Sequence, residues 1–356
     1  MINVTLRTQA RRDAVQVGGS RPLYCGAMKE RPREICEDEL ARVITGHWQL
    51  SPASLRYAPV GFGDHHWHLT DTAGSRWFVT VSRLSGGWRG AAAPAGYADL
   101  SAAMRTVTAL HGAGLEFAVA PVPDGDGEPL VPFGNDHAVA VFPHVPGDPG
   151  EFGDELGGAG RLRLVTLLAR LHLATPAVTG IAPVRQPGHA SRAELDAALA
   201  DLAGPWRGGP YSEPARCLLA QHAGEVAAAL ARFGELAAAV AGSGLVVTHG
   251  EPHPGNLIRG AAALHLVDWD TAGLAPPERD LWFAMAAGSA EADHYRDLTG
   301  HQPRPAVLQL YRLRWQLDDI ALAIGDFRAP HHQAADTELS WASLRRELAG
   351  LSRLAG

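Results

Sequence analysis

The spacing of hydrophobic residues changes once along this chain of 356 residues, and the change limits the folds open to it. Up to residue 142, short apolar runs alternate with glycine-containing turns, as in a small antiparallel sheet. Residues 143–150 read PHVPGDPG, a stiff linker in which proline and glycine exclude a continuous helix. Beyond it, apolar residues recur mainly at helical spacing. We predict an α+β fold with a small N-terminal antiparallel sheet lobe and a larger, mainly helical C-terminal lobe.

The predicted elements follow this division. Strand-like segments before the linker lie at 55–60, 67–70, 76–81, 118–122, 130–133 and 138–142, with helical segments at 34–46 and 97–110. Beyond the linker, helical periodicity covers 162–173, 193–202, 217–240 and 304–327, and a strand pair, 245–247 with 264–267, interrupts it. We expect a loose extension at 1–27, a first lobe at 28–142 and a second lobe at 143–356.

Composition excludes several kinds of site and partner. The net charge of −7 argues against a nucleic-acid partner and favours a small neutral or cationic one. The three cysteines include no CxxC pair, so neither a disulfide framework nor a thiolate zinc site is expected. The single lysine, Lys29, lies outside any Gly-Lys-Ser/Thr sequence, which excludes a P-loop. No apolar run of about 18 residues and no signal-type segment occurs, so we expect a cytoplasmic protein with no membrane partner.

A polar loop at 248–256, THGEPHPGN, concentrates the residues with catalytic potential. We expect its flanking strands to bring His249, Glu251, Asn256 and Asp268 close together. Phosphoryl transfer needs a carboxylate near the acceptor hydroxyl and oxygen ligands for Mg²⁺. Glu251 can supply the carboxylate, and Asn256 and Asp268 can supply the ligands.

Simpler interpretations of these residues stay open. His249 is suited to a structural role in which it hydrogen-bonds the loop backbone. Asn256 and Asp268 each also favour turns. A zinc site on His249, Glu251 and His253 is disfavoured, because the prolines of this loop prevent the helix that HExxH requires.

With these residues, the sequence resembles the aminoglycoside phosphotransferase and choline-kinase-like branch of the protein-kinase fold, over about residues 30–345. The family's catalytic loop, His-Gly-Asp-x-x-x-x-Asn, is similar to HGEPHPGN at 249–256. Asp268 matches the family's metal-binding Asp, and Asp280 matches an Asp near the start of the next helix. The resemblance implies a bilobal kinase-like fold and an enzyme that transfers the γ-phosphate of ATP, or of GTP, to a hydroxyl of a small molecule.

The resemblance also implies roles for individual residues of the loop. Glu251 stands where Asp is usual and would orient or deprotonate the acceptor hydroxyl, with His249 as the second catalytic candidate. Asn256 and Asp268 would hold Mg²⁺.

Acidic residues outside the loop are candidates for the acceptor site. Asp270 would either support the site or be a solvated loop charge. Asp318 and Asp319 on the late helix point about 100° apart and form an acidic face. In aminoglycoside-type relatives, acidic residues in this region hold substrate amines, whereas the simpler interpretation is a solvated helix face.

The nucleotide site is implied in the first lobe. Gly61 and Gly63 belong to a turn, Gly61-Phe62-Gly63-Asp64, that matches Gly-x-Gly-x-x-Gly only in part. Phe142 and His144 fall where the family's hinge meets adenine, and a simple connection between the two lobes explains this segment equally well. We interpret the histidines at 65, 66 and 68 beside the turn as incidental.

The phosphate-anchoring pair of the family is missing. Thr80 stands where the family has its phosphate-contacting Lys, and the following helix offers only Asp99 as an acidic residue. Arg83 is the candidate to supply the lost positive charge.

The acceptor is expected to be an aminoglycoside, an aminocyclitol or a related amine-bearing metabolite, and resistance and biosynthesis both stay open. Two alternatives are a pseudokinase-like binding or scaffold protein, indicated by the missing Lys, and a peptide Ser/Thr kinase of a natural-product pathway with a peptide substrate or partner protein.

Overall fold

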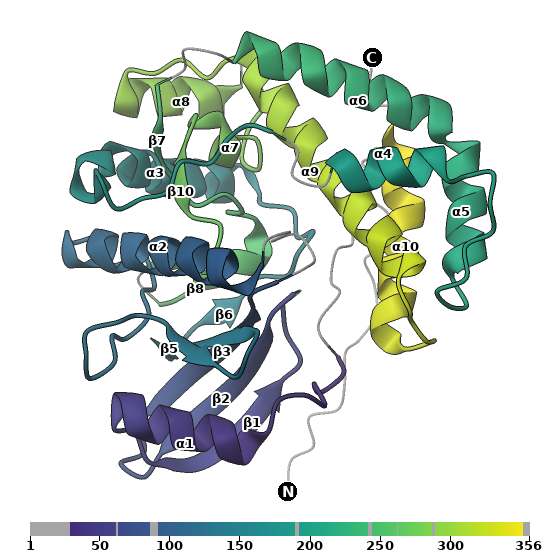
Figure 1. Ribbon diagram of the computed structural model, residues 1–356. Coiled ribbons are helices and arrows are strands. Elements are labelled where there is room, and N and C mark those ends of the chain that lie inside the picture. Colours follow the sequence, from purple (N-terminus) through teal and green to yellow (C-terminus); the bar gives the residue numbers. More distant parts are fainter. Residues whose placement is uncertain are drawn as a thin grey trace, which may run out of the picture.

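The computed structural model describes residues 29–61, 63–85, 92–188, 192–240, 244–261, 263–286 and 289–351 (Figure 1). The expected extension at 1–27 lies outside these residues. The first part of the chain forms an antiparallel sheet of five strands in the order β1-β2-β3-β5-β4. The strands are β1 (Pro52–Ala58), β2 (His65–Asp71), β3 (Arg76–Arg83), β4 (Val131–Phe133) and β5 (His137–Pro143).

Two helices cover the two faces of this sheet, α1 (Glu37–Trp48) and α2 (Ala93–Gly112) (Figure 1). Alternation along β3 decides which face each side chain meets. Val79 and Val81 are fully buried in a core with α1. Thr80, between them, therefore points to the opposite face.

The remaining chain is mainly helical, with short strands around the polar loop. Its helices are α3 (Gly158–Leu173), η2 (Thr175–Val178), α4 (Arg192–Ala200), α5 (Ser212–Gln221), α6 (Ala223–Ala239), η3 (Pro254–Asn256), α7 (Glu278–Leu281), α8 (Ala290–Thr299), α9 (Pro305–Arg328) and α10 (Ala335–Gly350). Its strands are β6 (Asp148–Pro149), β7 (Val246–Thr248), β8 (Leu257–Arg259), β9 (Leu264–Leu266) and β10 (Gly273–Ala275).

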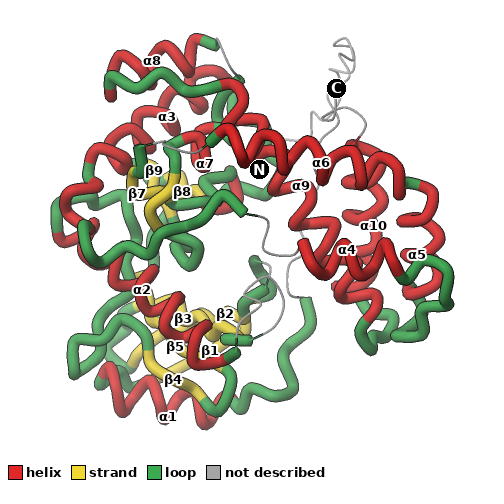
Figure 2. Tube along the Cα trace, turned by 45° about the horizontal axis from the view of Figure 1, so that its top comes forward, coloured by secondary structure: helices red, strands yellow, loops and turns green. Residues whose placement is uncertain are grey.

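These helices enclose two hydrophobic cores. One core joins α2 and α3 to the strands around the polar loop and to α8. The other joins α4, α5, α6 and α10 to the long helix α9, and these helices lie to one side of the rest (Figure 2). Among the described helices, none has both the length and the apolar character needed to cross a membrane. The predicted fold class is confirmed.

The predicted pairing of 245–247 with 264–267 is wrong. β7 pairs with β10, and β9 pairs with β8. The four residues between β8 and β9 close a local hairpin at a lower entropic cost than the longer loop from β7 would require. The polar loop is therefore held by two separate strand pairs.

Other predicted elements also differ from the structure. Residues 118–122 form no strand, and only an isolated bridge joins Ala118 to Leu266. The predicted helix at 217–240 is two helices, because α5 ends at Gln221 and α6 begins at Ala223. Helices α8 and α10 were not predicted, since α8 carries few apolar residues and α10 buries only Ser343, Leu344 and Leu348.

Candidate active site

A buried carboxylate, Asp280 on α7, holds the start of the catalytic loop. Its Oδ2 accepts the N–H of His249 at 2.9 Å, and its Oδ1 accepts the N–H of Gly250 at 2.7 Å. His172 of α3 donates to Oδ2 from Nε2 at 3.1 Å. Burial opposes ionisation, but the hydrogen bond and charge of His172 and the nearby Arg279 lower the pKa of Asp280 overall. A carboxylate in the core thus fixes the loop that carries Glu251.

His249 connects the catalytic loop to the strand that precedes Asp268. Its Nδ1 accepts the N–H of Glu251 at 3.1 Å, and its Nε2 donates to the carbonyl of Val267 at 2.9 Å. The side chain is fully buried, and burial lowers the pKa of His249 to about 4. Because both ring nitrogens bond backbone groups, the geometry supports the structural interpretation of His249.

Asn256 and Asp268 lie at the same end of the β8–β9 hairpin. The N–H of Val267 donates to the carbonyl of Asn256 at 3.0 Å, which brings the next residue, Asp268, alongside. The Asn256 Nδ2 donates to the carbonyl of Glu251 at 2.9 Å, so the side-chain oxygen is the atom left to act as a ligand. Asp268 is exposed and adopts a positive φ of 66°.

This donor set fits a magnesium ion, because Mg²⁺ prefers oxygen ligands and is bound through one or two side chains, with the other ligands from water and phosphate. No group of three or more His, Cys, Asp or Glu suited to a metal occurs in the part of the chain that the structure describes. The ion would therefore need phosphate and water ligands beside Asn256 and Asp268.

Three carboxylates lie near Glu251: Asp270, and the pair Asp318 and Asp319 on α9. Burial and then Asp270 raise the pKa of the half-buried Glu251 to about 7, and Asp318 on α9 adds to the rise. Burial raises the pKa of Asp319 well above its ordinary value, and Glu347 of α10, Asp318 and Glu251 add to the rise in that order. Asp318 also bonds Arg314 at 3.2 Å. The structure thus brings the acidic pair of α9 to the catalytic loop.

Aromatic rings lie beside the catalytic loop and form a cluster that the sequence pattern does not predict. Phe152 stacks parallel to Trp315 of α9 at 6.1 Å, and His253 meets Phe152 edge-on at 4.6 Å. Phe283 meets Trp315 edge-on at 5.2 Å, and Trp282 stacks near Phe283 at 3.8 Å. All five are only partly buried. They come from four separate segments, so no local pattern could have grouped them.

Arg279, which the sequence pattern does not single out either, hydrogen-bonds the residues on both sides of the catalytic loop. Its guanidinium donates to the hydroxyl of Thr248 at 2.8 Å and to the carbonyl of Thr271 at 3.0 Å. Gly250 adopts φ 105°, and a Cβ there would meet this guanidinium and the Thr271 hydroxyl. Only glycine fits at position 250.

On the nucleotide side, the glycine turn joins β1 to β2. Gly61 and Gly63 have φ of 76° and 92°, values that glycine adopts easily. Phe62 lies outside the described residues. Phe142 is half-buried on β5, and His144 follows the strand, with its N–H on the carbonyl of Arg76 at 3.2 Å.

Arg83 does not lie beside Thr80. It is on the α1 face of β3, where its guanidinium bonds Glu34 at 3.2 Å. Both side chains are about half exposed, at 57% and 45%. This placement does not favour Arg83 as the replacement for the missing lysine, since a strand shows residues three apart on opposite faces.

Asp99 on α2 does not pair with β3 either. Both of its carboxylate oxygens accept from the Nη1 of Arg185, at 2.6 and 2.7 Å. Arg185 also donates from Nε to the carbonyl of Ala272 at 3.1 Å. The acidic residue of α2 is thus tied to the segment that follows Asp268.

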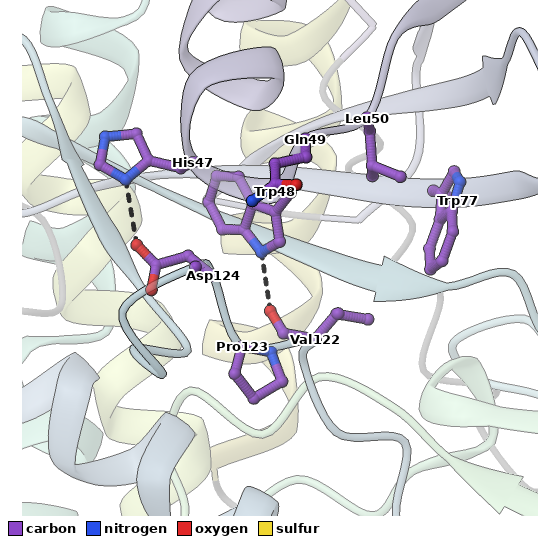
Figure 3. A pocket seen from close by; sticks show the side chains of 9 residues that line it. His47, Trp48, Gln49, Leu50, Trp77, Val122, Pro123 and Asp124 are labelled. Atoms are coloured by element: carbon purple, nitrogen blue, oxygen red, sulfur yellow. Dashed lines mark hydrogen bonds and ion pairs between the residues drawn. The ribbon is translucent and has the colours of Figure 1, made fainter.

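A small hollow on the sheet is separate from this site (Figure 3). It lies at the end of α1, where Trp48 donates to the carbonyl of Val122 at 2.7 Å and His47 contacts Asp124 at 3.0 Å. Trp77, which lines it, is on the α1 face of β3. The hollow is therefore on the opposite face of the sheet from Thr80.

An antiparallel sheet followed by a mainly helical region that carries this loop is the kinase-like fold of phosphotransferases. Sequence comparison agrees, because residues 54–312 match the phosphotransferase enzyme family. The chain belongs to this family and is an ATP-dependent small-molecule phosphotransferase.

One curated protein is similar to this chain in sequence, and several solved structures are similar to it in fold. Protein StrN of Streptomyces griseus is 31% identical over 259 residues, 67% of this chain and 74% of StrN. A spectinomycin phosphotransferase in complex with ADP and spectinomycin has a TM-score of 0.68 at 14% identity, covering 91% of this chain and 98% of its own. An amicoumacin kinase in complex with AMP-PNP and Ca²⁺ has a TM-score of 0.57 at 14% identity, covering 90% and 94%. At this identity the two structures show a shared fold alone.

Proposed function

We propose that this enzyme transfers the γ-phosphate of ATP to a hydroxyl of a small molecule that carries an amine, such as an aminoglycoside, an aminocyclitol or a related metabolite. The observation that carries this proposal is that Asp270 and Asp318 lie near Glu251: burial first, and then these two negative charges, raise the pKa of Glu251 to about 7. Glu251 in turn adds to the raised pKa of Asp319. A protonated amine bound here would offset the repulsion between the carboxylates. An acceptor without positive charge would not.

The loop residues would act mainly by positioning. Glu251 would accept a hydrogen bond from the acceptor hydroxyl and take its proton as the new bond to phosphorus forms. Asp280 holds the amides of His249 and Gly250, and His249 accepts the N–H of Glu251, so the loop that carries the Glu251 carboxylate is positioned before the substrate arrives. Asn256 and Asp268 would hold Mg²⁺, which neutralises phosphate charge when it is bound.

The aromatic cluster of Phe152, His253, Trp282, Phe283 and Trp315 would contact the apolar face of a ring in the acceptor. Trp315 lies one helical turn before Asp318, so one face of α9 offers both an aromatic surface and a carboxylate. A ring that bears an amine and a hydroxyl suits both features. The fold shared with a protein whose structure contains ADP and spectinomycin supports a nucleotide and a small acceptor in one enzyme.

The test is a phosphorylation assay with paired acceptors. Each amine-bearing aminocyclitol or aminoglycoside is compared with its analogue in which hydroxyl replaces the amine, and the phosphorylated product is detected by mass spectrometry. Asp318→Asn should raise KM for the amine-bearing acceptor by about 10- to 100-fold, the value of a lost charge-assisted hydrogen bond. The control Asp297→Asn, on the exposed side of α8, should leave KM unchanged. Equal turnover of both analogues would refute the proposal.

Thr80 in place of lysine indicated one alternative, a protein that binds nucleotide without transferring phosphate, and membership of the phosphotransferase enzyme family argues against it. The same assay decides between them, because such a protein would bind ATP and yield no phosphorylated product with any acceptor. Phosphate found only on an added peptide would favour the peptide-kinase alternative. The identity of the phosphorylated acceptor would also show whether the reaction inactivates a drug or belongs to biosynthesis. The use of ATP as phosphate donor fits a cytoplasmic location.

A further inference from the structure

His66 lies directly opposite Thr80 in the ladder between β2 and β3. Its Nδ1 lies 3.1 Å from the Thr80 hydroxyl, on the face of the sheet away from α1. The imidazole also stacks on Phe78 of β3, with ring centres 5.1 Å apart and planes 27° apart. The side chain is thus held in one orientation beside the position where the family has its phosphate-contacting lysine.

The glycine turn passes over the other side of the same ring. A Cβ on Gly61 would lie 2.9 Å from the Nε2 of His66, so the turn backbone reaches this nitrogen only because residue 61 is glycine. His66 is itself the last position of the Gly-x-Gly-x-x-Gly pattern that Gly61 and Gly63 begin. An imidazole therefore occupies space that a third glycine would leave open beneath the turn.

We propose that His66, oriented by Thr80, contacts the phosphates of the bound nucleotide in place of the missing lysine. The proposal rests on the proposed function for the presence of ATP, and it replaces the interpretation of this histidine as incidental. When the Thr80 hydroxyl donates to Nδ1, the Nε2–H becomes a donor directed at the underside of the turn. Within the described residues, the hydrogen bond to Thr80 is the only one that the His66 side chain makes. A hydrogen bond to an anionic phosphate oxygen is of the strong, charge-assisted kind.

The charges around His66 agree with a neutral donor. Burial, and to a smaller extent the neighbouring His65 and His68, lower the pKa of His66 to about 3. Arg83, the other candidate, lies on the opposite face and bonds Glu34. His66 is thus the group placed to donate to phosphate from the strand pair that carries Thr80.

The test compares the affinities for ATP and adenosine by isothermal titration calorimetry. His66→Ala should weaken ATP binding by about 10- to 100-fold and leave adenosine binding within about twofold, because adenosine has no phosphate. His65→Ala is the matched control, since His65 neighbours His66 but its ring faces Tyr57 on the other side of the sheet. The control should leave the ratio of the two affinities unchanged.

A second pair of variants checks the geometry. Thr80→Val keeps the shape of residue 80 but removes the hydroxyl that orients the ring, so the ATP-to-adenosine ratio should fall by a smaller factor. Thr80→Lys in the His66→Ala background restores the family's lysine beside a vacated space and should recover ATP affinity.

Several results would overturn the assignment. Unchanged ATP affinity in His66→Ala would refute it, and tighter binding would show instead that the imidazole obstructs the phosphates. Equal loss of ATP and adenosine affinity would indicate a structural role only. If the parent protein binds neither ATP nor adenosine, the proposed function is wrong. If the parent protein binds both and His66→Ala leaves their affinities unchanged, only the assignment of His66 is wrong.

Discussion

Replacing Asp280 with asparagine should both destabilise the protein and slow phosphoryl transfer. In the parent protein, this fully buried carboxylate accepts three hydrogen bonds, from the amides of His249 and Gly250 and from the ring of His172. Asparagine has nearly the same shape but only one acceptor oxygen. If that oxygen takes the place of Oδ2, the new NH₂ group faces the N–H of Gly250.

The magnitude follows from these contacts. A hydrogen bond to a charged group contributes about 1.5–3 kcal/mol, and a buried donor left without a partner costs about 1–3 kcal/mol. We therefore expect Asp280→Asn to lower the free energy of unfolding by about 2–4 kcal/mol, a large part of the total of about 5–15 kcal/mol. Because the pKa of Asp280 is lowered in the folded state, its contribution is complete above the ordinary value of 3.8 and is lost as the pH falls through the folded-state pKa. Measurements near pH 7.5 would record the whole effect.

The assay is urea denaturation followed by circular dichroism, together with kcat for ATP-dependent phosphorylation of an accepted substrate. Asp297→Asn is the control, because this aspartate is 70% exposed and pairs only at the surface, so its loss should change stability by less than about 0.5 kcal/mol. Asp280→Asn should also reduce kcat, since the same amides position Glu251. A variant that is as stable and as active as the control would refute the assigned role of Asp280.

Three further predictions concern the catalytic loop. Glu251→Gln should reduce kcat by about 10²- to 10⁴-fold and leave nucleotide affinity unchanged. The substitution should not lower Tm at pH 8, because it removes a carboxylate whose charged form is disfavoured by burial. A substantial residual kcat would contradict the role of Glu251. In the parent enzyme, kcat/KM should rise about tenfold between pH 6 and pH 8, because Glu251 must be ionised to act and its pKa is about 7, whereas a flat profile over this range would show that its ionisation does not limit the rate. Gly250→Ala should lower the free energy of unfolding by about 2 kcal/mol or more in urea titrations, because φ is 105° and a Cβ would meet Arg279. Gly112→Ala is the control: a Cβ there meets nothing within 4 Å, so this substitution should not destabilise the protein.

Some features of the site could be predicted because they are local in sequence. Glu251 and Asn256 lie five residues apart in one proline-stiffened loop, and Asp268 follows a short hairpin. Strand alternation alone places Arg83 and Thr80 on opposite sides of β3, because they are three residues apart. The register that sets His66 opposite Thr80 needed the pairing of β2 with β3.

By itself, the sequence determined the two-part α+β layout, the loop that carries Glu251, and the family, since each depends on periodicity or on a motif of a few consecutive residues. Only the tertiary structure decided which strands pair, which acids meet at Glu251 and which groups hold Asp280 and Asp99. The contacts that hold Asp280 and Asp99 join residues about 30 to 110 positions apart, such as His172 with Asp280 and Asp99 with Arg185. These contacts form only when whole helices pack in a shared core, and the pattern of neighbouring residues in the sequence does not predict that packing.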